Sequence, residues 1–125
     1  MNARPRRSVL YMPGSNVRAL EKAKTLPVDG VILDLEDSVA PEAKEDARQK
    51  VAEAVKAGGF GGREVFIRVN GVETPWHADD LSVAAHAAPD VILVPKVSTP
   101  DTLELIGRRL LDMGPRHRTR VWAMI

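Results

Sequence analysis

The chain has 125 residues, with 18 lysines and arginines against 17 aspartates and glutamates, and no cysteine. This near-neutral charge gives no reason to expect nucleic acid or an anionic membrane as a partner, and the absence of cysteine excludes disulfides, thiolate metal sites and a cysteine nucleophile. The basic N-terminus lacks the apolar stretch of a signal peptide, so we expect a cytoplasmic protein. The length suffices for one core but falls short of the roughly 250 residues of a closed eight-stranded barrel.

Five short apolar runs predict strands, because each is rich in Val, Ile or Leu and too short for an amphipathic helix. They cover residues 8–12, 31–35, 65–69, 91–94 and 120–125. Their continuous rather than alternating hydrophobicity favours strands that are covered on both faces, as parallel strands are when helices pack around them.

Four segments between these runs predict helices. Apolar residues at intervals of three and four mark residues 41–57 and 100–113, each with a proline at its start and a glycine after its end. Shorter helices are expected at about residues 16–24 and 79–88. The resulting order, β-α-β-α-β-α-β-α-β, implies right-handed crossovers and a parallel sheet, but does not by itself separate a barrel from an open doubly wound sheet.

Carboxylates follow the second predicted strand at its carboxyl end, the end where both parallel architectures bind ligands. The segment 34–37 reads Asp-Leu-Glu-Asp, and three like charges repel one another unless a cation, water or basic groups lie among them. A divalent metal would resolve this repulsion. In the alternative interpretation, Asp37 or Ser38 caps the next helix and the other acids pair with surface lysines.

Basic residues end the third and fourth predicted strands. Arg68 lies in a mostly apolar run, where a guanidinium is costly to bury unless a carboxylate or phosphate meets it. Its candidate partners are a substrate carboxylate and, as an internal ion pair, Glu36 or Asp37. Lys96 is a candidate Schiff-base lysine, although a lysine that pairs with an acid or fills a polar barrel layer is commoner.

The turn at residues 13–16 precedes a predicted helix, whose free N–H groups and positive dipole end attract anions. Ser15 lies in this turn, and Arg18 and Lys22 follow it one helical turn apart. These three residues are candidates for holding the phosphates of a nucleotide-like handle, with a capped and solvated basic helix as the alternative. The glycine spacings of a P-loop or a dinucleotide fingerprint do not occur, and the histidines show no zinc-binding spacing.

Six short motifs at predicted strand ends and helix starts, in this order, resemble the citrate lyase β-subunit-like family, and the match runs from Arg7 to the last residue. They are Arg7-Ser8-Val9-Leu10-Tyr11-Met12-Pro13-Gly14, Lys22-Ala23, Asp34-Leu35-Glu36-Asp37-Ser38-Val39, Lys44 with Ala47-Arg48, Ile67-Arg68-Val69-Asn70, and Val94-Pro95-Lys96-Val97. The resemblance implies an α/β fold, the (β/α)8 TIM barrel. Residues 1–125 would form its N-terminal half, about as far as the fifth strand, and we expect a truncated lyase domain.

The resemblance also implies roles for single residues. The arginine that matches Arg68 binds the carboxylate or carbonyl of the substrate's acid portion, and the acids that match Glu36 and Asp37 line an Mg²⁺ pocket, mostly through water. Arg68 and Glu36 are therefore the candidate catalytic residues. The segment around Ser15, Arg18 and Lys22 lies near the coenzyme A or acyl-carrier handle. The direct magnesium ligands of the family are expected beyond Ile125, so this chain by itself should be inactive.

The function implied by the resemblance is that of a metal-dependent carbon–carbon lyase. Its substrate would be a 3-hydroxyacyl thioester of the citryl-, malyl- or citramalyl-CoA type, cleaved to an acyl-CoA and an oxo acid, and the family assembles as a homo-oligomer, a trimer. The alternatives are an aldolase that acts on free 2-oxo acids and a non-catalytic half-barrel. The predicted site depends on one spatial prediction, that Glu36, Asp37 and Arg68 converge on a shared rim where a metal-bound acid can rest.

Overall fold

The computed structural model describes residues 6–113 and 119–124. Within these residues, strands and helices alternate along the chain, and no helix is long and apolar enough to cross a membrane. The strands are β1 (Val9–Pro13), β2 (Gly30–Asp34), β3 (Glu64–Arg68), β4 (Val91–Val94) and β5 (Arg120–Ala123). The helices are α1 (Val17–Ala23), the 3₁₀ helix η1 (Pro41–Ala43), α2 (Lys44–Ala57), α3 (His77–Ala87) and α4 (Pro100–Met113).

The predicted elements are confirmed, with small shifts at their ends. Strands β2 and β3 each begin and end one residue earlier than predicted. Leu35 and Val69, which follow their ends, are buried in the core and donate backbone hydrogen bonds to Arg68 and Leu93, so hydrophobicity does not mark where these strands end. The predicted helix at 41–57 is divided, since its first turn, which starts with Pro41, is the 3₁₀ helix. The last predicted strand extends to Ile125, which lies outside the described residues.

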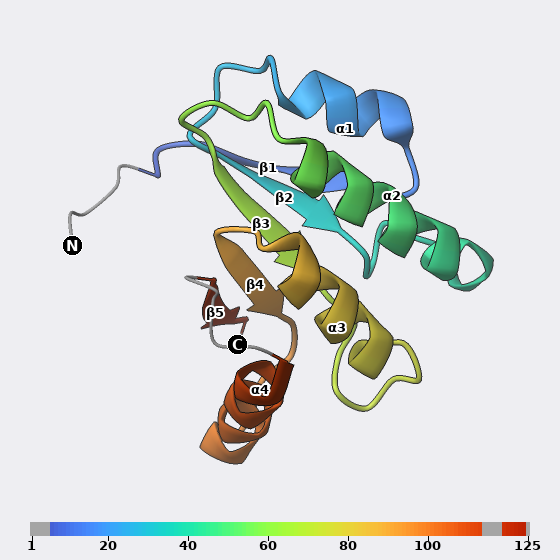
Figure 1. Ribbon diagram of the computed structural model, residues 1–125, viewed down its shortest axis with the longest axis vertical. Coiled ribbons are helices and arrows are strands. Elements are labelled where there is room, and N and C mark those ends of the chain that lie inside the picture. The colour runs from blue at the N-terminus through green and yellow to red at the C-terminus, as the bar shows by residue number, and fades with distance from the viewer. Residues whose placement is uncertain (1–5, 114–118, 125) are drawn as a thin grey trace.

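The sheet is parallel throughout and its strands follow the chain order, β1-β2-β3-β4-β5. Successive helices pack against one another, and α1, α2 and α3 lie along the same side of the sheet (Figure 1). A doubly wound sheet would instead reverse its strand order at a switch point and carry helices on both faces. The arrangement is that of the first strands of a (β/α)8 barrel, and the predicted fold class is confirmed.

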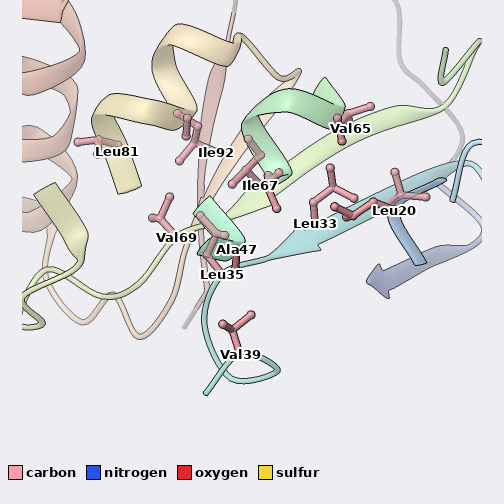
Figure 2. Packing of buried hydrophobic residues seen from close by; sticks show 14 of the residues in the cluster. Leu20, Leu33, Leu35, Val39, Ala47, Val65, Ile67, Val69, Leu81 and Ile92 are labelled. Carbon is pink, nitrogen blue, oxygen red and sulfur yellow. The ribbon is translucent and has the colours of Figure 1, made fainter. Parts of the chain in front are cut away.

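The main hydrophobic core lies between the sheet and the helices. Leu33 and Ile67 from the strands meet Leu20 of α1, Ala47 of α2 and Leu81 of α3 there, all almost completely buried (Figure 2). Burying one such leucine or isoleucine side chain contributes about 1.5–3 kcal/mol, so this layer is the main source of the sheet's stability.

A smaller cluster covers the opposite face of the sheet. It contains Ile32, Phe66, Val91 and Leu93, with Trp122 packed edge-on against Phe66 at a ring-centroid distance of 5.1 Å. Because side chains alternate along a strand, the residues next to the helix-facing ones point to this second face. The central strands are therefore buried on both sides, as their continuous hydrophobicity predicted.

Candidate functional site

Asp34 and Arg68 form a buried ion pair at the carboxyl ends of β2 and β3. They are direct partners in the parallel register, so both side chains leave the sheet on the face opposite the helices. Arg68 donates from Nε to Asp34 Oδ1 at 2.7 Å and from Nη2 to Oδ2 at 2.8 Å, a bidentate geometry. The Tyr11 ring of β1 lies 4.7 Å from the guanidinium carbon, within range of a cation–π contact.

The electrostatics of this pair keep both groups ionised. Burial on its own would raise the pKa of Asp34, but hydrogen bonds from Arg68, from the Ser38 hydroxyl and from the backbone N–H groups of Glu36 and Ser38 outweigh it and lower that pKa to about 2. The hydrogen bond to Asp34 in turn raises the pKa of Arg68. Asp34 is thus a fixed anion that holds the arginine in place and also closes the turn after β2.

Glu36 lies beside the pair, with its carboxylate between two cations. Its Oε1 is 3.4 Å from Arg68 Nη1, and its Oε2 is 3.6 Å from Lys96 Nζ. Oε1 is buried and accepts no hydrogen bond from any described residue. A buried charged oxygen without a donor is costly, so this atom is prepared for a ligand that the protein itself does not supply. We call Asp34, Glu36, Arg68 and Lys96 the rim group.

Arg68 also keeps binding capacity. Asp34 takes the edge formed by Nε and Nη2, which leaves Nη1 and the second Nη2 hydrogen along the other edge of the guanidinium. Within the described residues, the contacts of Nη1 are the loose ion pair with Glu36 and a weak contact to the Met124 sulfur at 3.9 Å. This open edge therefore keeps hydrogen-bond donors for a carboxylate.

A second polar network fixes the backbone behind the rim group. Lys44 of α2 donates from Nζ to the carbonyls of Leu35 and Glu36 at 3.0 and 2.9 Å, and Asn70 donates to the Leu35 carbonyl at 2.9 Å. Asp80 of α3 accepts from the Asn70 backbone N–H and from Nε of Arg48, both at 2.9 Å. These contacts hold the turn that carries Glu36 against α2 and α3.

Sequence reasoning assigned no role to this network. The motifs that carry the family resemblance include Lys44, Arg48 and Asn70, so the sequence indicated that these residues matter. Asp80 had no such signal, because an acid in the first turn of a helix is ordinarily a solvated residue that favours the helix dipole.

Gly14 allows the first two strand ends to approach closely. Its N–H donates to the Asp34 carbonyl at 2.8 Å, and a Cβ at this position would lie 2.5 Å from the same oxygen and 2.8 Å from Val51 Cγ2. Any larger residue would have to push the end of β2 away, and Asp34 with it.

The structure brings together two of the three residues that were predicted to converge. Glu36 and Arg68 share the rim group, whereas Asp37 is exposed and makes no hydrogen bond or ion pair with another described residue. The internal partner of Arg68 is chiefly Asp34, with Glu36 more loosely held and Asp37 not involved. The metal role assigned to Asp37 stays a prediction.

The segment predicted to bind the coenzyme handle lies at the start of α1. Asn16 caps this helix by accepting from the Ala19 N–H at 3.1 Å, and the Ser15 carbonyl accepts from Lys50 at 3.2 Å. Arg18 and Lys22 are exposed on α1. Their handle-binding role also stays a prediction.

The oxygen donors of the site fit a divalent metal only through an outer contact. Among the described residues, no three His, Cys, Asp or Glu side chains gather closely enough to hold one. Glu36 Oε1 is nevertheless an unsatisfied hard oxygen of the kind that accepts a hydrogen bond from metal-bound water. The residues present fit the outer contact that was predicted for Glu36.

The family is decided by comparison with known proteins. A family model described as HpcH/HpaI aldolase/citrate lyase matches residues 7–114. The chain belongs to this family. Its membership agrees with the motifs at the strand ends, including those that supply Glu36, Arg68 and Lys96.

Individual relatives of this family share most of the chain. A (3S)-malyl-CoA thioesterase of Cereibacter sphaeroides is 42% identical over 98% of the chain, and the match covers 41% of the relative. The citrate lyase subunit beta of Leuconostoc mesenteroides subsp. cremoris is 37% identical over 89% of the chain and 37% of the relative. The chain thus spans about two fifths of the length of these curated relatives.

A solved structure supports the same fold. The CitE protein of Mycobacterium tuberculosis, in complex with magnesium, acetoacetate and coenzyme A, superposes with a TM-score of 0.67 and is 26% identical, over 92% of this chain and 38% of the other. The half-barrel described above is therefore an arrangement that members of this family adopt.

Proposed function

We propose that the full-length protein containing this chain is a magnesium-dependent carbon–carbon lyase that cleaves a malyl-, citramalyl- or citryl-type CoA thioester. Residues 1–125 would supply the first half of its barrel and one side of its active site. The observation that carries the proposal is the rim group, where Arg68 keeps an open edge next to the unsatisfied oxygen of Glu36.

Each residue of the rim group has a role in this proposal. Arg68, fixed by Asp34, orients the substrate's acid portion through its open edge, so that the carbon–carbon bond is aligned for cleavage. Glu36 holds water in the site through Oε1. A bound magnesium ion would supply positive charge against the oxygen that becomes negative during cleavage. The solved CitE complex with magnesium and coenzyme A supports both ligands for this family.

The test uses the full-length protein with Mg²⁺ and malyl-CoA. Arg68→Ala should lower kcat/KM by at least about a hundredfold, the scale of lost substrate positioning. Arg108→Ala is the matched control, because Arg108 is exposed on α4 and contacts no member of the rim group among the described residues. Near-normal turnover of Arg68→Ala would remove Arg68 from the site.

A second candidate is thioester hydrolysis, favoured by the name of the malyl-CoA thioesterase relative. The two reactions differ in the bond that breaks. Lyase cleavage of malyl-CoA yields acetyl-CoA and glyoxylate, whereas hydrolysis consumes water and yields malate and free coenzyme A. Chromatography of the products separates them, because only hydrolysis releases a free thiol.

Two further candidate functions can be distinguished from the lyase by substrate choice and by ligand binding. An aldolase on free 2-oxo acids would cleave a hydroxy-oxo acid without coenzyme A, and would be unaffected by loss of Arg18 and Lys22. A non-catalytic half-barrel would leave the full-length protein unable to bind Mg²⁺ or coenzyme A in calorimetry.

A further inference from the structure

Lys96 adopts a backbone conformation that its residue type disfavours. It lies two residues after β4 with φ of 55°, in the left-handed region, where glycine or asparagine is the usual choice because a Cβ is crowded there. The other described non-glycine residue with positive φ, Ala88, ends helix α3, where such a conformation is ordinary. Strained backbone of this kind clusters at functional sites, and Lys96 lies at the rim.

The Lys96 ammonium lies at the mouth of the rim group. Its side chain is 70% exposed, yet Nζ is 3.6 Å from Oε2 of Glu36, whose side chain is only 10% exposed. The other Glu36 oxygen is 3.4 Å from Arg68 Nη1. Both distances exceed the 2.7–2.9 Å of a charge-assisted hydrogen bond, so the Glu36 carboxylate is held loosely between the two cations.

This arrangement shows that Arg68 and Lys96 are spaced to take the two oxygens of one carboxylate. We propose that Lys96 binds the carboxylate of the substrate's acid portion together with the open edge of Arg68, next to the Glu36 carboxylate that both cations approach at 3.4 and 3.6 Å. This inference rests on the proposed function, which requires an anionic acid portion at the rim.

Charge supports this assignment. The four rim side chains carry two positive and two negative charges, so their sum is zero. Without Lys96, the sum becomes negative and an incoming carboxylate would be repelled. Asp34 already neutralises Arg68, so Lys96 is the rim cation that offsets the charge of Glu36.

The exposure of Lys96 argues against a Schiff-base role. A Schiff-base lysine is activated by desolvation in an apolar pocket or by a neighbouring cation. The Lys96 side chain is mostly in solvent and its neighbour in the rim group is a carboxylate. An ionic contact is the role that this environment favours.

The experiment measures binding of pyruvate, as a 2-oxo acid probe, to the full-length protein with Mg²⁺ by calorimetry. Lys96→Met should weaken pyruvate binding about tenfold, the size of one lost ionic contact, while leaving the uncharged methyl pyruvate unaffected. Lys96→Arg should restore most of the pyruvate affinity. Lys56→Met, at an exposed lysine in the last turn of α2, is the control and should bind like wild type. With malyl-CoA, the Lys96→Met loss should fall on KM rather than on kcat.

Three outcomes overturn the inference. Equal pyruvate affinity in Lys96→Met and wild type, with matching thermal midpoints, would remove Lys96 from the site. A pyruvate adduct on Lys96 after borohydride reduction would replace the ionic contact by a Schiff base. Failure of the wild-type protein both to bind pyruvate and to act on malyl-CoA would refute the proposed function, and this inference with it.

Discussion

Two buried arginine–aspartate pairs lie close together in this fold and differ in what surrounds them. Arg48 and Asp80 join helix α2 to α3, and Arg68 and Asp34 join strand β2 to β3. All four side chains are nearly or completely buried. The first pair lies among the helices, whereas the second lies at the carboxyl ends of the strands.

The surroundings show which pair is structural and which belongs to a site. Both Asp80 oxygens have donors, from Arg48 on one side and from Asn70 on the other. The second pair has a loosely held third acid, Glu36, with an unsatisfied oxygen. The helix region has its own unsatisfied atom, His77 Nε2, but this is a ring nitrogen whose partner Nδ1 bonds the Asn70 carbonyl at 2.7 Å, and it is not a carboxylate oxygen. A buried charged oxygen without a donor is the costlier feature and marks the functional region.

The largest stability effect is expected where the structural pair is broken. Asp80→Ala leaves Arg48 buried without a counter-charge and should lower the free energy of unfolding by about 3–5 kcal/mol, measured by denaturant titration of the full-length protein. The control is Asp79→Ala, since the Asp79 side chain is 76% exposed and 4.0 Å from Arg48. A loss below about 1 kcal/mol for Asp80→Ala would contradict its role as the anchor of the network.

The second pair, Asp34 with Arg68, should make the stability of the protein depend on pH. Because the pKa of Asp34 is lowered from 3.8 to about 2 in the folded state, its ionised form stabilises the fold above about pH 4, and this contribution is lost as the pH falls towards 2. The contribution amounts to roughly 2 kcal/mol. Asp34→Asn should lack this component of the acid-induced loss, whereas Asp37→Asn should retain it. Identical slopes for wild type and Asp34→Asn between pH 5 and pH 2 would refute the low pKa.

The smallest stability effect is expected at Glu36, together with a large effect on activity. Glu36→Gln removes a charge whose Oε1 has no hydrogen bond, so the free energy of unfolding should change by less than about 1 kcal/mol. The same variant should lower kcat/KM by about a hundredfold if Glu36 acts in the site. A loss of stability as large as that of Asp80→Ala would instead assign Glu36 to the framework.

Local sequence determined the elements and their β-α alternation. Runs of Val, Ile and Leu with helical periodicity between them specify strands and helices because burial of both sheet faces and of one helix face requires those patterns. The helix predicted at residues 100–113 and the strand at 91–94 coincide with α4 and β4. The positions of Glu36 and Arg68 at strand ends followed from the same reasoning, with the motifs pointing to the family.

Tertiary structure alone decided which charges meet. Arg68 was expected to pair with Glu36 or Asp37, but the parallel register sets Asp34 opposite it, and the alternation of side chains turns both to the same face. Asp80 is 32 residues from Arg48, a separation that no local pattern can bridge. Strand order likewise separated the barrel arrangement from the doubly wound one, because the β-α alternation is common to both and only the pairing of strands distinguishes them.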